Sequence, residues 1–227
     1  MHEKLTEGKL AQILEAGICE FASKGMEKAS MRAIAKRAGT SVGVLYKYYS
    51  DKEALFLACV RRSTGRLEQA LKEVLEDPDD RLLPCADRVI RVLQRHAAEH
   101  GNDIRMYHEI TSGRNSSRAA ALAGEIERVT AELYTAIIKK AQKEGHVRED
   151  MDPGMFAFFF DNLLMMLQFS YCCDYYRERW KLYGAGGRQP DDGQVRRELL
   201  KFMESAFTFE QSEIRHHMNM CTHEVRL

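Results

Sequence analysis

The chain has 227 residues, 44% of them hydrophobic and 30% charged, with 34 basic side chains balancing 34 acidic ones, and it can bury a substantial core in one or two domains. Its first residues lack the apolar core of a signal peptide, and the longest apolar stretch, 155–167, is interrupted by Asp161 and Asn162, so we expect neither export nor a membrane span. The six cysteines show no CxxC spacing, which predicts reduced thiols in a cytoplasmic protein.

Nearly the whole chain is expected to be helical, because only four prolines interrupt it and strand-like alternation is absent. We therefore predict an all-α fold with an N-terminal helical domain over residues 1–52, a larger helical body over 53–211 and a flexible tail over 212–227. The predicted helices cover residues 5–24, 31–38, 42–49, 52–76, 81–100, 102–112, 116–144, 153–183 and 192–211.

Residues 30–53 spell two short helices around a glycine-centred turn. Apolar residues recur at helical spacing from Met31 to Ala38, which predicts one buried stripe. Gly39 then supplies the turn, because glycine takes a positive φ without strain, and Ser41 follows as an N-cap for the second helix. This pattern is typical of a helix-turn-helix that binds double-stranded DNA.

Positive charge is concentrated at this motif. Residues 28–52 hold six basic side chains against one acidic residue, Asp51, in a chain that is neutral as a whole. Such an excess is expected of a module that binds phosphates. The exposed face of the second motif helix carries residues that suit a DNA groove, namely Val42, Gly43, Tyr46, Lys47 and Tyr48.

At these residues the chain resembles the TetR family of bacterial transcriptional repressors. The family pattern IAxxAGxSxGxLYxY, followed by an aromatic residue and xxKE, is met by Ile34-Ala35, Ala38-Gly39, Ser41, Gly43, Leu45-Tyr46, Tyr48 and Lys52-Glu53. The preceding helix also matches, whereas the resemblance beyond the N-terminal domain is architectural only. The resemblance to the TetR family implies an N-terminal DNA-binding domain joined to a helical domain for ligand binding and dimerisation.

The resemblance also implies which residues touch DNA. Ser30 or Met31 begins the first motif helix beside a phosphate, and Arg32 points toward the major groove. The expected contacts to the DNA backbone come from Thr40, Ser41, Tyr46, Tyr48 and Lys52, and the residues expected nearest the bases are Val42, Gly43 and Lys47. We hypothesise that Arg32 and Lys47 carry the sequence information.

The last two predicted helices are expected to form a homodimer. The helix from residue 153 is apolar nearly all round, and the final helix carries apolar residues at alternating spacings of four and three. The expected interface residues are Phe160, Leu164, Val195, Leu199, Phe202, Ala206 and Phe209. A four-helix bundle of two helices from each chain would place two recognition helices about 34 Å apart on a palindromic operator. The alternative is a monomer in which both stripes are internal.

Residues 81–176 are expected to line a cavity for a hydrophobic small-molecule effector. The candidate ligand-binding residues are Leu93, His96, His100, Tyr107, His108, Asn162, Met166, Phe169, Cys173 and Tyr176; ordinary core packing is the alternative for each of them. A metal could be held by the pair His96 and His100, but no third ligand is in view. The tail 216–223 is rich in His, Met and Cys, but no rigid frame fixes these ligands. We therefore expect no metal and no cofactor.

The predicted function is a ligand-responsive transcriptional repressor whose effector shifts the helix from residue 52 and lowers DNA affinity. No nucleophile motif, phosphate loop or metal signature appears, so we do not expect an enzyme. The alternative is a helical small-molecule-binding or scaffolding protein without specific DNA binding, and loss of salt-sensitive DNA binding would distinguish it.

Overall fold

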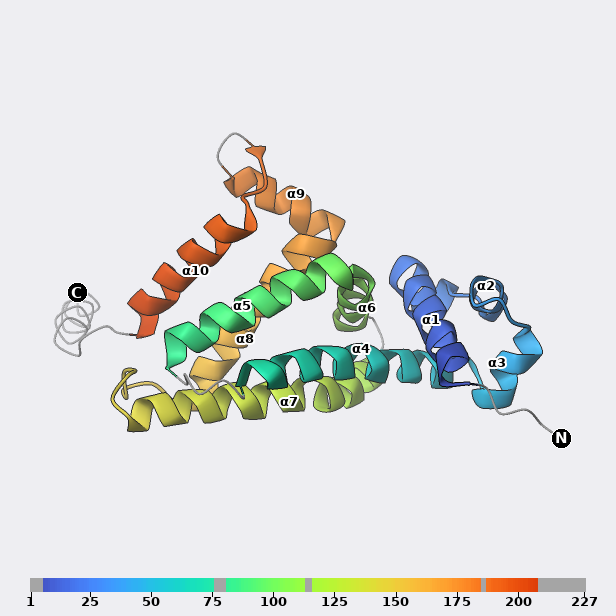
Figure 1. Ribbon diagram of the computed structural model, residues 1–227, viewed down its shortest axis with the longest axis horizontal. Coiled ribbons are helices and arrows are strands. Elements are labelled where there is room, and N and C mark those ends of the chain that lie inside the picture. Colours follow the sequence, from blue (N-terminus) through green and yellow to red (C-terminus); the bar gives the residue numbers. More distant parts are fainter. Residues whose placement is uncertain (1–5, 76–80, 113–115, 185–186, 208–227) are drawn as a thin grey trace, which may run out of the picture.

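The computed structural model describes residues 6–75, 81–112, 116–184 and 187–207, and these residues are almost entirely helical, as predicted (Figure 1). The helices are α1 Glu7–Lys28, α2 Met31–Arg37, α3 Val42–Tyr48, α4 Lys52–Leu75, α5 Leu82–Glu99, α6 Gly101–Thr111, α7 Ser116–Lys143, α8 Pro153–Cys172, α9 Asp174–Tyr183 and α10 Asp192–Phe207. The end of the last predicted helix, Phe209 and the tail lie outside the described residues.

The molecule is elongated, with the helix-turn-helix motif at one end (Figure 1). Helices α1–α3 form this end, which we call the head, and α4 runs from the head into a body made of α5–α10. Within the body α7 packs on α8, and α10 packs on α5. Helix α6 packs against α1, so the body touches the head directly as well as through α4.

Local sequence signals fix the motif helices. Ser30 caps α2 by accepting a hydrogen bond from the Ala33 amide, and Ser41 caps α3 by accepting one from the Val44 amide. Gly39 adopts a φ of 59° in the turn between the two helices, as predicted. The Lys9 ammonium donates to the carbonyl oxygens of Ala38 (2.7 Å) and Gly39 (3.0 Å) and so ties α1 to this turn.

The core of the head extends beyond residue 52, where the sequence analysis ends the first domain. Leu55 and Cys59 of α4 are fully buried together with Leu45 of α3. Met106 of α6 and Leu122 of α7 belong to the same cluster. Head and body therefore share buried side chains, and α4 contributes to the cores of both.

The single helix predicted over 153–183 is wrong, because the structure breaks it at Cys173, whose backbone is extended (φ −104°, ψ 130°). The guanidinium of Arg105 donates to the Cys172 carbonyl oxygen at 2.9 Å and so satisfies an acceptor exposed at the end of α8. This partner comes from α6, distant in sequence, and neither Gly nor Pro marks the break.

Candidate functional site

The motif helices present a basic and aromatic surface on the head. Arg32 of α2 and Gly43, Tyr46 and Lys47 of α3 are exposed. The Lys47 ammonium lies 5.7 Å from the ring centroid of Tyr48. The structure thus leaves these predicted DNA-contacting residues accessible on the motif helices, with exposed Ser41 and half-buried Thr40 at the start of α3.

Three residues that we predicted to contact DNA also pack in the core of the head or join its helices. The Met31 side chain is buried in the head core, and Val42 packs partly against that core. The Lys52 ammonium donates to the carbonyl oxygens of Glu27 (2.8 Å) and Ala29 (3.1 Å), so it joins the start of α4 to the end of α1. For Met31 only the backbone remains available to a phosphate, and for Lys52 one of three donors.

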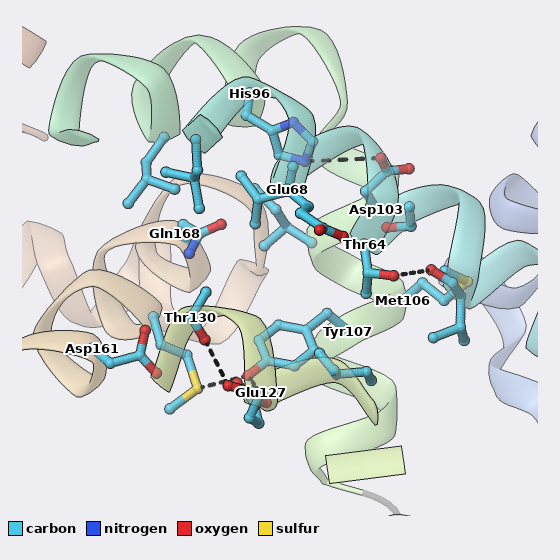
Figure 2. Close-up of a pocket in the computed structure, with 18 of the residues that line it drawn as sticks. Thr64, Glu68, His96, Asp103, Met106, Tyr107, Glu127, Thr130, Asp161 and Gln168 are labelled. Atoms are coloured by element: carbon cyan, nitrogen blue, oxygen red, sulfur yellow. Dashed lines mark hydrogen bonds and ion pairs between the residues drawn. The ribbon is translucent and has the colours of Figure 1, made fainter. Parts of the chain in front are cut away.

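A cavity of about 110 Å³ lies in the body between α4, α5, α6, α7 and α8 (Figure 2). One water needs about 10 to 15 Å³ of such space, so the cavity accommodates a molecule of roughly ten non-hydrogen atoms. Its apolar lining residues are Val60, Leu67, Leu71, Leu93, Ile104, Met106, Ile110, Ile126 and Met165, and its polar and aromatic ones are Ser63, Thr64, Glu68, His96, Asp103, Tyr107, Glu127, Thr130, Tyr134, Asp161 and Gln168.

Of the predicted ligand-binding residues, Leu93, His96 and Tyr107 line this cavity. The others, His100, His108, Asn162, Met166, Phe169, Cys173 and Tyr176, are not among its lining residues. His108, Phe169 and Tyr176 instead pack ring against ring, with centroids 5.0 to 5.5 Å apart. The amide of Asn162 donates to the Phe158 carbonyl oxygen at 2.7 Å, and the side chain of His100 contacts Arg66.

The expected ligand-binding residues include none of the polar residues of α7 and α8 that line the cavity. Glu127, Thr130 and Tyr134 follow helical spacing on α7, and Asp161 and Gln168 lie seven residues apart on α8. On α8 the available signal is the presence of these polar residues in an otherwise apolar helix. Figure 2 shows Glu68, Tyr107, Asp161 and Gln168 around the same space.

An ion-pair network connects buried Asp103 in the cavity wall to exposed Glu15 on the head. Asp103 lines the cavity and accepts a hydrogen bond from Arg66 of α4 at 2.9 Å. The same guanidinium donates to Glu15 of α1 at 2.5 Å and lies 3.0 Å from the His100 ring. Arg66, which belongs to α4, therefore contacts the head through Glu15 and the cavity wall through Asp103.

Burial shifts the protonation of several groups around the cavity. Burial, and then the neighbouring Glu127, raises the pKa of Asp161 to about 6. Burial also raises the pKa of Tyr107, whose hydroxyl donates to Glu127 at 2.5 Å. His96 has its pKa lowered to about 4, first by burial and then by His100 and Arg66, so it is neutral at pH 7.

The lowered pKa of His96 predicts a loss of stability in acid. In the unfolded chain the pKa is near 6.5, so the unfolded state binds a proton that the folded state rejects until pH falls to about 4. We expect this histidine to cost about 2 kcal/mol of stability between roughly pH 6.5 and roughly pH 5. Urea unfolding at the two pH values measures it.

The control is His96→Gln, which cannot titrate in this range and should lose the histidine's contribution to the pH dependence. Asp103 and Asp161 act with the opposite sign, because burial raises the pKa of each, and both are present in the two proteins. An unchanged pH dependence in His96→Gln would contradict the prediction.

Helix α8 has a second apolar face that the subunit does not cover. By length and composition helix α8 is apolar enough to cross a membrane, with a mean hydropathy of 1.3. One face of this helix lies in the body core. We predicted Phe160 and Leu164 at the dimer interface, but both side chains are buried in the core of the subunit. The exposed apolar side chains of α8 are instead Met155, Phe158, Phe159 and Leu163.

On α10 the predicted interface residues are divided between two environments. Phe202 is 58% exposed, whereas Val195 and Leu199 pack partly against the body core and Ala206 is half-buried. The outward-facing residue of this stripe is thus Phe202.

Comparison with known proteins identifies the head. The sequence profile of the family described as "Bacterial regulatory proteins, tetR family" matches residues 13–59. An uncharacterised HTH-type transcriptional regulator, YvdT, of Bacillus subtilis is 38% identical over 77 residues, which is 34% of this chain and 40% of that protein. The HTH-type transcriptional regulator BetI of Yersinia pestis is 37% identical over 81 residues, 34% of this chain and 41% of that protein. These alignments thus span about two fifths of each relative.

The fold similarity extends over nearly the whole chain. The crystal structure of the transcriptional regulator FadR from Bacillus subtilis in complex with stearoyl-CoA has a TM-score of 0.69 and 17% identity, covering 88% of this chain and 100% of that chain. At this identity the similarity establishes the all-α architecture of head and body and nothing about the ligand.

Proposed function

Because the chain belongs to the TetR family of bacterial regulatory proteins, we propose that it is a cytoplasmic repressor that binds a palindromic operator as a homodimer and is released by a small-molecule effector. The observation that carries this proposal is the exposed basic and aromatic surface of α2 and α3, held on a compact head. The cavity in the body supports a ligand-controlled activity rather than constitutive DNA binding.

The proposed DNA contacts divide into positioning and base-reading groups. Tyr46, Ser41 and Thr40 would contact phosphates, while Arg32 and Lys47 would reach base edges from α2 and α3. Because phosphate contacts release counterions, binding should weaken steeply with salt.

We expect Arg32→Ala and Lys47→Ala each to weaken binding to the operator by about 1 to 3 kcal/mol and to relax the base preference at one position. Binding to random DNA should change much less. The measurement is selection of bound genomic fragments by the purified protein, followed by titration of the selected sequence and a scrambled control. Lys24→Ala serves as a matched control, since this lysine is exposed on α1 outside the motif. Equal losses on specific and random DNA would contradict a base-reading role.

The proposed homodimer uses the exposed apolar face of α8. Met155, Phe158, Phe159 and Leu163 present exposed apolar side chains at helical spacing on it. Such an exposed apolar surface is typical of an association site. Two-fold symmetry would then place two recognition helices on successive major grooves.

The proposed coupling runs from the cavity to the head through Arg66. A ligand that contacts Asp103 or moves α6 alters the geometry of the Arg66 guanidinium, which also holds Glu15 of α1. Helix α6 packs directly on α1 as well. A coupling free energy of about 1 to 3 kcal/mol would change operator affinity roughly 5- to 150-fold.

The experiment that tests the function is an operator titration at several salt concentrations, with and without compounds that occupy the cavity. A palindrome preferred by a factor of roughly a thousand or more supports a specific dimeric regulator. Uniform weak binding to all DNA would favour the alternative, a helical ligand-binding or scaffolding protein. The FadR complex with stearoyl-CoA supports the idea that a body of this fold can hold a small molecule.

A further inference from the structure

The charged side chains that line the cavity are acidic. Its described lining residues include four carboxylates, on Glu68, Asp103, Glu127 and Asp161, and none of these lining residues is Lys or Arg. The carboxylates come from α4, α6, α7 and α8 and surround a single space. Acidic side chains therefore face a ligand from four of the five helices that line the cavity.

Two of the four carboxylates have a cationic partner outside the cavity. The Lys72 ammonium lies 2.6 Å from Glu68, and the Arg66 guanidinium lies 2.9 Å from Asp103. These two acids are accounted for as ion pairs within the fold.

The other two acids have no such partner among the described residues. The Glu127 carboxylate accepts a hydrogen bond from the neutral hydroxyl of Tyr107, whereas the Thr130 hydroxyl donates to the backbone carbonyl oxygen of Glu127. No described side chain donates one to Asp161. Burying an uncompensated carboxylate is unfavourable, since its charge loses hydration without gaining a counter-charge. The raised pKa of Asp161, caused by burial and by Glu127, is the expected consequence.

The walls between these acids suit an organic group. Tyr107 and Tyr134 both line this space, and Tyr134 is close enough to Asp161 to feel its charge, so aromatic rings that can attract a cation lie beside the acids. Leu71, Leu93 and Ile104 complete the wall with apolar surface. A bare metal ion would find no ligand set there, because the described residues contain no group of three or more His, Cys, Asp or Glu placed to hold one.

From this combination we infer that the effector is a small organic cation, an amine or quaternary ammonium with an apolar body, held between Glu127 and Asp161. The inference rests on the proposed function, since it names the ligand class of the proposed effector cavity. The positive group replaces the missing counter-charge, and the apolar body fills the remaining space.

The test compares three probes of similar size by calorimetry on the full chain without DNA. These are benzyltrimethylammonium, its neutral carbon isostere neopentylbenzene, and the anion 4-phenylbutyrate. We expect the cation to bind at least tenfold more tightly than the neutral isostere, and the anion not to bind measurably. The variants Asp161→Asn and Glu127→Gln should each weaken cation binding about tenfold and leave the neutral isostere unaffected.

Glu132→Gln is the matched control, because Glu132 is an exposed acid on the same helix as Glu127 and does not line the cavity. Equal binding of cation and isostere, tighter binding of the anion, or indifference of the cation to both cavity variants would each overturn the inference. Thermal unfolding of each variant checks that it remains folded.

A second arm separates this inference from the proposed function. Operator affinity is measured with each probe at saturation. If cation binding depends on Glu127 and Asp161 but does not change operator affinity, the inference stands and the proposed release mechanism fails. If only the neutral or anionic probe binds and lowers operator affinity, the release mechanism stands and the cation inference fails.

Discussion

Replacing both Phe158 and Phe159 by Glu is expected to convert the protein to a monomer and to weaken operator binding by roughly 10²- to 10⁴-fold, the advantage that linking two binding units provides. These rings are 58% and 52% exposed on α8. In the proposed dimer each would face the other subunit, where a buried unpaired carboxylate is strongly unfavourable. Sedimentation should give a mass near the chain mass of 26.1 kDa instead of twice that value.

Because both side chains are half-exposed in the subunit, the variant should keep its fold, which circular dichroism checks. The matched control replaces both residues by Leu, which keeps the surface apolar and should preserve the dimer. A double Glu variant that remains dimeric would remove this face of α8 from the interface. A wild-type protein that sediments as a monomer would support the alternative in which no dimer forms.

The second large effect is expected from Arg66→Met, which should destabilise the protein by about 3 to 5 kcal/mol, the usual cost of removing one partner of a buried ion pair. Asp103 is almost completely buried, with 4% of its side chain exposed, and Arg66 is its closest cation. For a chain of this size the expected fall in melting temperature is roughly 6 to 20 °C. Thermal unfolding measured at pH 7 tests it.

Arg62→Met provides the comparison, because Arg62 pairs with Glu15 alone and both side chains are at least one-third exposed. Such an exposed pair contributes at most about 1 kcal/mol. The double variant Arg66→Met with Asp103→Asn should recover part of the loss, since it no longer leaves a buried charge unpaired. Similar losses in Arg66→Met and Arg62→Met would show that Asp103 does not depend on Arg66.

The sequence predicts the head well because its signals are local. Ser30, Gly39 and Ser41 fix their caps and turn through contacts a few residues away, and the structure reproduces them. The helices of the body also follow from helical periodicity, within a few residues at most ends. The break at Cys173 does not, because the Arg105 side chain that satisfies it comes from another helix.

The cavity and the exposed face of α8 depend on packing that periodicity does not specify. In a helix that is apolar on all sides, no pattern distinguishes the inward Phe160 from the outward Phe159, so periodicity assigns Phe160 and Leu164 to an interface although they lie in the core of the subunit. The same ambiguity assigns His108 and Phe169 to a ligand site, although they pack with Tyr176. Which acids lack a counter-charge is visible only once α4, α6, α7 and α8 are placed together.

The shared core of head and body has a consequence for folding. Met106 of α6 and Leu122 of α7 are buried with Leu45 and Leu55 of the head, so the DNA-binding unit does not complete its own interior. Its unfolding is therefore thermodynamically linked to that of the body, and the two should melt as one cooperative unit rather than as independent modules. A head cut at residue 52 would lose that support. Exchanging heads between related proteins would then require the buried contacts from α6 and α7 to be exchanged with them.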